Sequence, residues 1–218
     1  MNVIKKEISI PLGTSFIHGD LTIVPDEKGL IVFAHGSGSS RLSSRNKFVA
    51  EILQQGQFST FLFDLLTPEE DRIDEYTREF RFNIPLLAER LVLVTQWIRE
   101  QKDRSQKLGY FGASTGAAAA LIAAAQLPQE VFAVVSRGGR PDLAGDALPL
   151  VKAPTFLIVG ELDFEVITLN KEAYSQLSCE KKIEIVPGAT HLFEEGDTLR
   201  EAAQRSLQWF TLHLTENS

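Results

Sequence analysis

The chain has 218 residues, of which 44% are hydrophobic and 23% are charged, and its formal net charge is −7. This length suits one domain, 1–218, with a single core, and the composition excludes both a disordered chain and an integral membrane protein. The acidic balance argues against nucleic acid as a partner, because proteins that bind nucleic acid concentrate basic residues on one face.

The first two predicted elements form a hairpin. Residues 3–10 and 14–24 alternate polar and apolar side chains, as half-buried strands do, and residues 11–13 supply a short turn between them. We therefore expect an antiparallel hairpin at one edge of a sheet.

The later strands have a different pattern. From Leu30 onward the apolar runs are continuous, which is typical of parallel strands with helices on both faces. These runs are 30–34, 59–63, 107–111, 131–135, 155–159 and 183–186. Helical patterns separate them at roughly 46–55, 84–101, 115–126, 166–177 and 197–213. The alternation predicts an α/β fold with about eight strands in a mostly parallel sheet.

We assign no catalytic or binding role to two connecting segments. The acidic stretch 68–79 is expected to be a solvated loop and the start of a helix. Residues 136–153 leave room for a loop and one short helix between two predicted strands. We therefore expect no cap domain over the site.

A Gly-x-Ser-x-Gly motif, 112–116, lies between a predicted strand and the alanine-rich helix. Small residues at both flanks allow a sharp strand-to-helix turn that exposes the hydroxyl of Ser114. The motif alone is short enough to arise by chance, so its position carries the argument. We interpret Ser114 as a candidate nucleophile. The alternative is a glycine-rich turn without catalysis.

A serine hydroxyl needs a base, and the base needs a third group that orients it. Asp163 and His191 follow the last two predicted strands. The carboxyl ends of parallel strands share one edge of the sheet, where open α/β sheets place their sites. The chain order Ser114, Asp163, His191 therefore predicts a catalytic triad, with Glu161 and Glu165 as neighbouring carboxylates that could be confused with Asp163.

The segment His-Gly-Ser-Gly-Ser, 35–39, follows the third predicted strand. Acyl transfer places negative charge on the carbonyl oxygen, and backbone donors aimed at that oxygen lower the barrier. We expect these donors to be the N–H groups of Ser37 and Thr115. The alternative is a phosphate cradle before the helix that begins near Asn46, although no Gly-x-Gly-x-x-Gly or Walker pattern is present. His35 is interpreted as a structural loop histidine.

Arg137 and Arg140 follow the strand after the alanine-rich helix, at the same edge of the sheet. A guanidinium there could hold a substrate carboxylate through two hydrogen bonds, and the two glycines between the arginines leave room for it. The alternative is an internal ion pair with an acidic neighbour such as Asp142.

Together these motifs resemble the α/β-hydrolase superfamily, and the small size of the chain resembles the dienelactone hydrolase-like branch. The likeness rests on segment 35–39, the Ser114 turn, Asp163 after the penultimate strand and His191 after the last. Typical dienelactone hydrolases carry a cysteine nucleophile, whereas this chain has Ser114. The resemblance implies hydrolysis of an ester, lactone or similar acyl bond in a small molecule, with no metal and no organic cofactor.

Other functions remain open at this point. The same triad could serve an acyltransferase or a carbon–carbon hydrolase, and a non-catalytic binding protein could use the same fold. The oligomeric state is not indicated.

The expected location is the cytoplasm. The single cysteine, Cys179, cannot form an internal disulfide, which suits a reducing compartment. Residues 7–14 lack the apolar core of a signal peptide, and the longest apolar stretches are too short to cross a bilayer. We therefore expect no membrane partner.

Overall fold

The computed structural model describes residues 2–101 and 107–214. Within these residues an eight-stranded sheet has the order β1-β2-β4-β3-β5-β6-β7-β8. The strands are β1 (Ile4–Leu12), β2 (Ser15–Ile23), β3 (Gly29–Ala34), β4 (Phe58–Phe63), β5 (Leu108–Ala113), β6 (Val131–Arg137), β7 (Thr155–Gly160) and β8 (Lys181–Val186). Strands β3 to β8 pair in parallel, as the continuous apolar runs predict.

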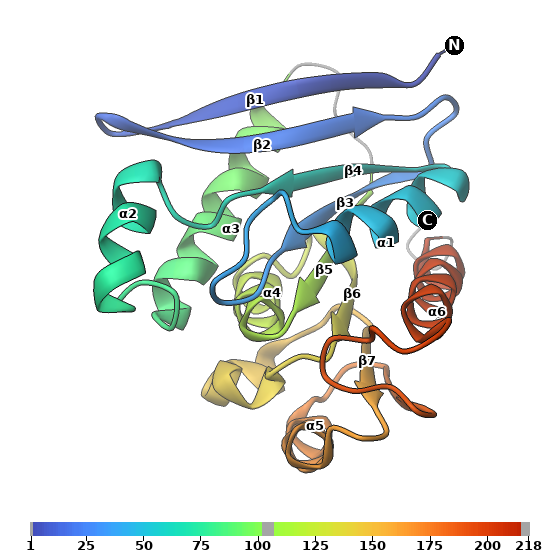
Figure 1. Ribbon diagram of the computed structural model, residues 1–218. Coiled ribbons are helices and arrows are strands. Elements are labelled where there is room, and N and C mark those ends of the chain that lie inside the picture. The colour runs from blue at the N-terminus through green and yellow to red at the C-terminus, as the bar shows by residue number, and fades with distance from the viewer. Residues whose placement is uncertain (1, 102–106, 215–218) are drawn as a thin grey trace.

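The N-terminal hairpin forms one edge of this sheet, as expected. Strand β1 pairs antiparallel with β2, and β2 pairs antiparallel with β4. Figure 1 shows the hairpin as the two blue strands above the parallel part of the sheet. Because the two hairpin strands lie outside the parallel set, they contribute little to the edge where the parallel strands end.

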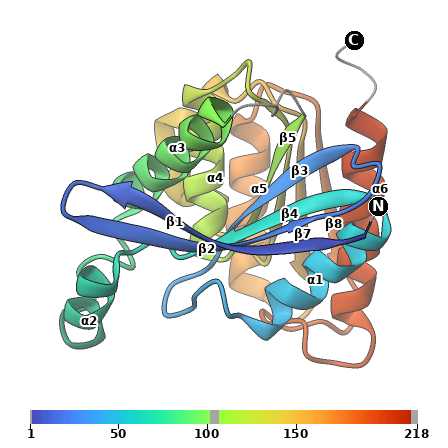
Figure 2. The ribbon, with the colours of Figure 1, turned by 90° about the horizontal axis from the view of Figure 1, so that it is seen from above.

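Helices cover both faces of the sheet. The described helices are α1 (Ser44–Gln55), α2 (Pro68–Thr77), α3 (Ile84–Glu100), α4 (Thr115–Gln126), α5 (Phe164–Gln176) and α6 (Thr198–His213), with a 3₁₀ helix η1 (Pro141–Leu150). Figure 2 shows α3, α4 and α5 on one face, and α1 and α6 on the other. Two apolar clusters fill the spaces between sheet and helices. This is the α/β-hydrolase arrangement that the sequence predicts.

Helix α2 is a full helix where the sequence analysis expected a loop and a helix start. The hydroxyl of Thr67 accepts a hydrogen bond from the Glu70 N–H (3.2 Å), and the Glu70 carboxylate accepts one from the Thr67 N–H (2.8 Å). This reciprocal pair is a capping box, and Pro68 occupies the first turn, where proline suits a helix. The acidic residues of the first turn therefore favour the helix, because they face the positive end of its dipole.

The connection between β6 and β7 holds only the short helix η1 within the described residues. Helix η1 packs against α4 and α5 rather than extending over the sheet edge. The chain at this point is therefore too short to form a cap, as expected. None of the helices in the described part of the chain is long and apolar enough to cross a membrane.

Candidate active site

Ser114 lies at the sharp turn between β5 and α4. Its φ of 50° and ψ of −124° are unusual for a residue with a side chain, so the turn is strained. A Cβ on Gly112 would lie 2.5 Å from the Ala117 Cα, and one on Gly116 would collide with the Ala34 carbonyl. Glycine is therefore required on both sides of the serine, which explains the motif physically.

The backbone of this turn is held by the end of β6. The Ser114 carbonyl accepts a hydrogen bond from the Arg140 N–H (3.0 Å), and the Ser114 N–H donates to the Arg137 carbonyl (3.4 Å). The hydroxyl is thus presented from a fixed backbone at the carboxyl edge of the sheet.

His191 and Asp163 meet beside this turn. The distance between His191 Nδ1 and an Asp163 carboxylate oxygen is 2.6 Å. Asp163 precedes α5, but its side chain does not cap that helix, so the carboxylate is free for the imidazole. With Nδ1–H donated to Asp163, Nε2 is left as the proton acceptor.

The neighbouring carboxylates have other positions. Glu161 accepts a hydrogen bond from the Gly188 N–H (2.8 Å) and so holds the loop that leads to His191. Glu165 lies in the first turn of α5. Of these three carboxylates, Asp163 is therefore the one that contacts His191.

Ser114 and His191 line one pocket of about 210 Å³ at this edge of the sheet. The two side chains make no hydrogen bond to each other among the described residues. In proteins without substrate, such bonds are often long and form only in the complex. The pocket therefore brings the candidate nucleophile and the candidate base to the same edge of the sheet.

The oxyanion segment differs from the sequence prediction in one respect. The structure brings Ser37 and Thr115 together, but the Ser37 N–H donates to the Thr115 hydroxyl at 2.9 Å. The predicted donor is therefore already engaged in the absence of substrate. A Cβ on Gly36 would lie 2.9 Å from the Ser114 Cβ, so the segment and the nucleophile turn are in close contact.

His35 has a structural role, as interpreted from the sequence. Its Nε2 accepts a hydrogen bond from the Leu65 N–H (3.0 Å), and its Nδ1 lies 2.9 Å from the Gly36 carbonyl. Burial lowers the pKa of His35 below 6.5. A neutral imidazole that donates through Nδ1 and accepts through Nε2 satisfies both partners, so His35 is not a second base.

The two candidate arginines have different environments. Arg140 forms a two-point ion pair with Asp142, at 2.9 and 2.8 Å, and does not line the pocket of Ser114. This is the internal pair that the sequence analysis gave as the alternative. Arg137 lines the pocket and is only 6% exposed. Its guanidinium donates to the Leu192 carbonyl (3.4 Å) and lies over the Phe193 ring.

Among the residues lining this pocket that sequence reasoning missed are Arg45 and Asn46. Both belong to the first turn of α1, which packs near the end of β6 only after the sheet has formed. The one signal that pointed to this region was the alternative of a phosphate cradle before the helix near Asn46. Arg45 forms an ion pair of 2.6 Å with Glu194.

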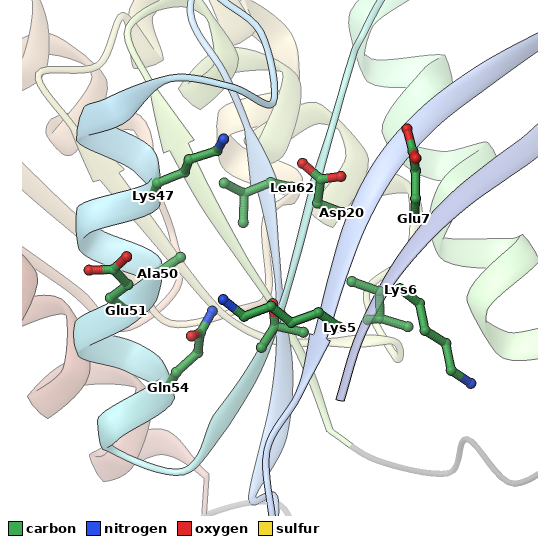
Figure 3. A pocket seen from close by; sticks show the side chains of 11 residues that line it. Lys5, Lys6, Glu7, Asp20, Lys47, Ala50, Glu51, Gln54 and Leu62 are labelled. Atoms are coloured by element: carbon green, nitrogen blue, oxygen red, sulfur yellow. The ribbon is translucent and has the colours of Figure 1, made fainter. Parts of the chain in front are cut away.

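A larger pocket, of about 350 Å³, lies between α1 and the N-terminal hairpin. Figure 3 shows Lys47 and Glu51 reaching it from α1, and Lys5 and Asp20 reaching it from the hairpin. Its charged lining residues are three lysines and three carboxylates, and no serine, cysteine or histidine is among the lining residues. We therefore take the smaller pocket, which contains Ser114 and His191, as the candidate active site. Across the described ranges, no group of three or more His, Cys, Asp or Glu is placed to hold a metal ion.

Comparison with known proteins gives a consistent family and fold. The model of the dienelactone hydrolase family matches residues 23–215. The crystal structure of a dienelactone hydrolase from Anabaena variabilis is 51% identical with a TM-score of 0.95, and the match covers 98% of this chain and 99% of the other. Est1E from Butyrivibrio proteoclasticus, with ferulic acid bound, shares the fold at 13% identity with a TM-score of 0.80, over 96% of this chain and 100% of Est1E.

A longer relative is found in two strains of Mycobacterium tuberculosis, where it is provisionally named a phosphoribosyl transferase. It is 52% identical over 210 residues, which is 96% of this chain and 46% of the relative. This chain therefore spans about half the length of the curated relatives that it matches.

Proposed function

The chain belongs to the dienelactone hydrolase family and has the α/β-hydrolase fold, and from this premise we propose that it hydrolyses a small carboxylic ester or lactone through an acyl-enzyme on Ser114. The observation that carries the proposal is the 2.6 Å contact between His191 and Asp163 beside the strained turn that exposes Ser114. A serine on a strained turn beside a histidine that is held by a carboxylate is the arrangement that nucleophilic acyl transfer requires.

The first half-reaction forms the acyl-enzyme. Ser114 Oγ attacks the acyl carbon while His191 Nε2 accepts the hydroxyl proton, and the carbonyl oxygen becomes negatively charged. The carbon–oxygen bond to the alcohol then breaks, and His191 gives its proton to the leaving oxygen. In a lactone that oxygen stays joined to the acyl group, so the product remains on the enzyme as one piece.

The second half-reaction releases the acid. A water molecule gives a proton to His191 Nε2 and attacks the ester carbon of the acyl-enzyme, after which the Ser114 oxygen leaves with the proton from His191. Asp163 accepts the hydrogen bond from His191 Nδ1 throughout and stabilises the imidazolium that forms in each half. No metal or organic cofactor takes part in this sequence of steps.

Charge on the carbonyl oxygen is stabilised by the N–H groups of Thr115 and Ser37. The Ser37 N–H donates to the Thr115 hydroxyl before substrate binds, so it must exchange that hydroxyl for the carbonyl oxygen when the oxyanion develops. Donors that need no reorganisation at the moment of reaction are the more effective ones, which makes the Thr115 N–H the main donor in this proposal.

The proposed substrate is small and soluble. The pocket has a volume of about 210 Å³ and no cap domain covers it within the described chain. Ligand pockets for larger molecules are usually about 300–1,000 Å³. We place this activity in the cytoplasm, in line with the expectation from the sequence.

Two alternative activities, acyl transfer and phosphoribosyl transfer, have less support than hydrolysis. An acyltransferase would use the same acyl-enzyme with an acceptor other than water, and the open pocket does not exclude water, which favours hydrolysis. We do not propose phosphoribosyl transfer for this chain, because the name belongs to a relative of which it spans 46%, and the hydrolase family accounts for residues 23–215.

Labelling with a fluorophosphonate tests the proposal, since only an activated serine reacts quickly with it. We expect one label on Ser114 and none on the Ser114→Ala protein. A panel of esters, lactones, thioesters and amides then identifies the bond that is cleaved. Absence of label on a folded wild-type protein would support a non-catalytic binding protein instead.

A further inference from the structure

We propose that the pocket of Ser114 contains a phosphate-binding subsite formed by Arg137, Arg45 and the first turn of α1, and that the ester or lactone cleaved at Ser114 carries a phosphate group. The identity of the substrate rests on the proposed hydrolase function. The binding of phosphate does not, because it requires no turnover.

Arg137 carries a buried charge without an anionic partner. Its side chain is 6% exposed, no carboxylate within the described chain forms an ion pair with it, and its Nε makes no hydrogen bond. Burial, together with the positive charge of Arg45, lowers the pKa of Arg137 to about 10. Burying an unpaired charge is costly, and the usual solution is an anion that pairs with it. Here the space for such an anion is the pocket itself.

Arg45 adds a second guanidinium to the same pocket. Its only carboxylate contact among the described residues is with Glu194, whose side chain is 58% exposed. Exposed ion pairs are weak, so Glu194 can be displaced from Arg45 by a stronger anion at little cost. An entering group therefore meets two positive charges.

The first turn of α1 completes the subsite. Ser43 caps this helix, no acidic residue occupies the first turn, and the N–H groups of Ser44 and Arg45 have no hydrogen-bond partner within the described residues. A helix N-terminus with free N–H groups favours an anion. Here it coincides with two arginines.

The distribution of these donors favours phosphate over a carboxylate. Arg137 comes from the end of β6, Arg45 comes from α1, and Ser37 and Ser39 come from the segment after β3. A planar carboxylate is satisfied by a single guanidinium, whereas the three oxygens and two charges of a phosphate suit donors that converge from several elements. The carboxylate partner that the sequence suggested for Arg137 is thereby replaced by a phosphate.

Calorimetric titration with inorganic phosphate at about pH 8 tests the subsite, with acetate as the carboxylate probe. We expect wild type to bind phosphate at least about tenfold more tightly than acetate, and Arg137→Gln and Arg45→Gln to weaken phosphate binding by about tenfold or more. Glu194→Gln should bind phosphate more tightly, because it removes the competing carboxylate. Arg140→Gln, which removes a nearby arginine outside the pocket, should bind as wild type does.

Three results would overturn the proposal. These are an absence of phosphate binding to wild type, unchanged binding in Arg137→Gln and Arg45→Gln, or acetate binding as tight as phosphate binding. Melting curves confirm that each variant is folded. If Arg137→Gln does not fold, Arg45→Gln and Glu194→Gln still decide the question through their opposite expected shifts. The same titration on Ser114→Ala separates the outcome from any failure of the hydrolase proposal.

Discussion

The Ser37 N–H donates a hydrogen bond of 2.9 Å to the hydroxyl of Thr115, the residue that follows the proposed nucleophile. Two segments that are far apart in the sequence are thereby joined beside the turn of Ser114. The bond holds the segment that contains Ser37 against that turn.

Loss of this bond should slow turnover without preventing folding. We expect Thr115→Val, which keeps the side-chain shape, to lower kcat by about three- to tenfold, because a net hydrogen bond contributes about 0.5–1.5 kcal/mol. Thr115→Ser keeps the hydroxyl and should behave as wild type. Steady-state kinetics on both variants checks this. A Val variant with full kcat would show that the bond does not position the Ser37 segment for turnover.

The three triad residues should act as a unit. We expect Ser114→Ala or His191→Ala to lower kcat by roughly 10³- to 10⁶-fold and Asp163→Asn somewhat less. The double variant of Ser114 and His191 should be scarcely slower than either single variant. Additive losses in kcat would contradict the assignment.

The motif glycines should be required for stability as well as for geometry. A Cβ on Gly116 would collide with the backbone carbonyls of Ala34 and His35, so Gly116→Ala should destabilise the fold by about 3 kcal/mol or more. Gly188 has a φ of +70° but open space around it, so Gly188→Ala should cost only about 1–2 kcal/mol. Chemical denaturation of both variants compares the two effects. If the two variants lose the same free energy of unfolding, the cost arises from backbone conformation and not from collision of the added Cβ.

Burial of His35 predicts a dependence of stability on pH. Because its pKa is lowered from 6.5 in the folded protein, the unfolded chain binds more protons below that pH. The stabilising contribution of the neutral imidazole is therefore complete above about pH 6.5 and is lost as pH falls below it. The free energy of unfolding should fall more steeply between about pH 7 and about pH 5 in wild type than in His35→Gln. If the free energy of unfolding falls equally steeply with pH in both proteins, His35 is not the cause of the pH dependence.

The open pocket predicts a preference for short acyl groups. Between β6 and β7 the described chain contains only helix η1, so no lid is present to shelter a long acyl chain. We expect a higher kcat/KM on acetyl and butyryl nitrophenyl esters than on the palmitoyl ester, and no activation at a lipid surface. A preference for the palmitoyl ester would require a larger acyl site than the pocket of about 210 Å³ offers.

Much of the architecture could be predicted because its cause is local. Alternating side chains predicted the β1–β2 hairpin, and continuous apolar runs predicted the parallel strands. The position of Asp163 and His191 after the last two strands placed them at the same edge as Ser114, where the structure shows Asp163 and His191 in contact. Helix α2 was underestimated because its acidic residues were interpreted as solvated, although Thr67 and Glu70 form a capping box.

The arginines show where local reasoning ends. Arg137 and Arg140 are three residues apart, yet one pairs with Asp142 and the other lies in the pocket. This difference depends on the direction in which each side chain leaves the end of β6. Arg45 enters the same pocket from a helix about ninety residues earlier, a proximity that only the packed sheet creates.

The order of the site residues along the chain also bears on when the protein becomes active during synthesis. The ribosome delivers Ser114 and Asp163 well before His191, which follows β8, one of the last described elements. Domains complete their packing only as their late segments emerge. If the proposed mechanism holds, a nascent chain exposes Ser114 without a base beside it, and hydrolysis begins only once β8 has joined the sheet and brought the imidazole of His191 into place.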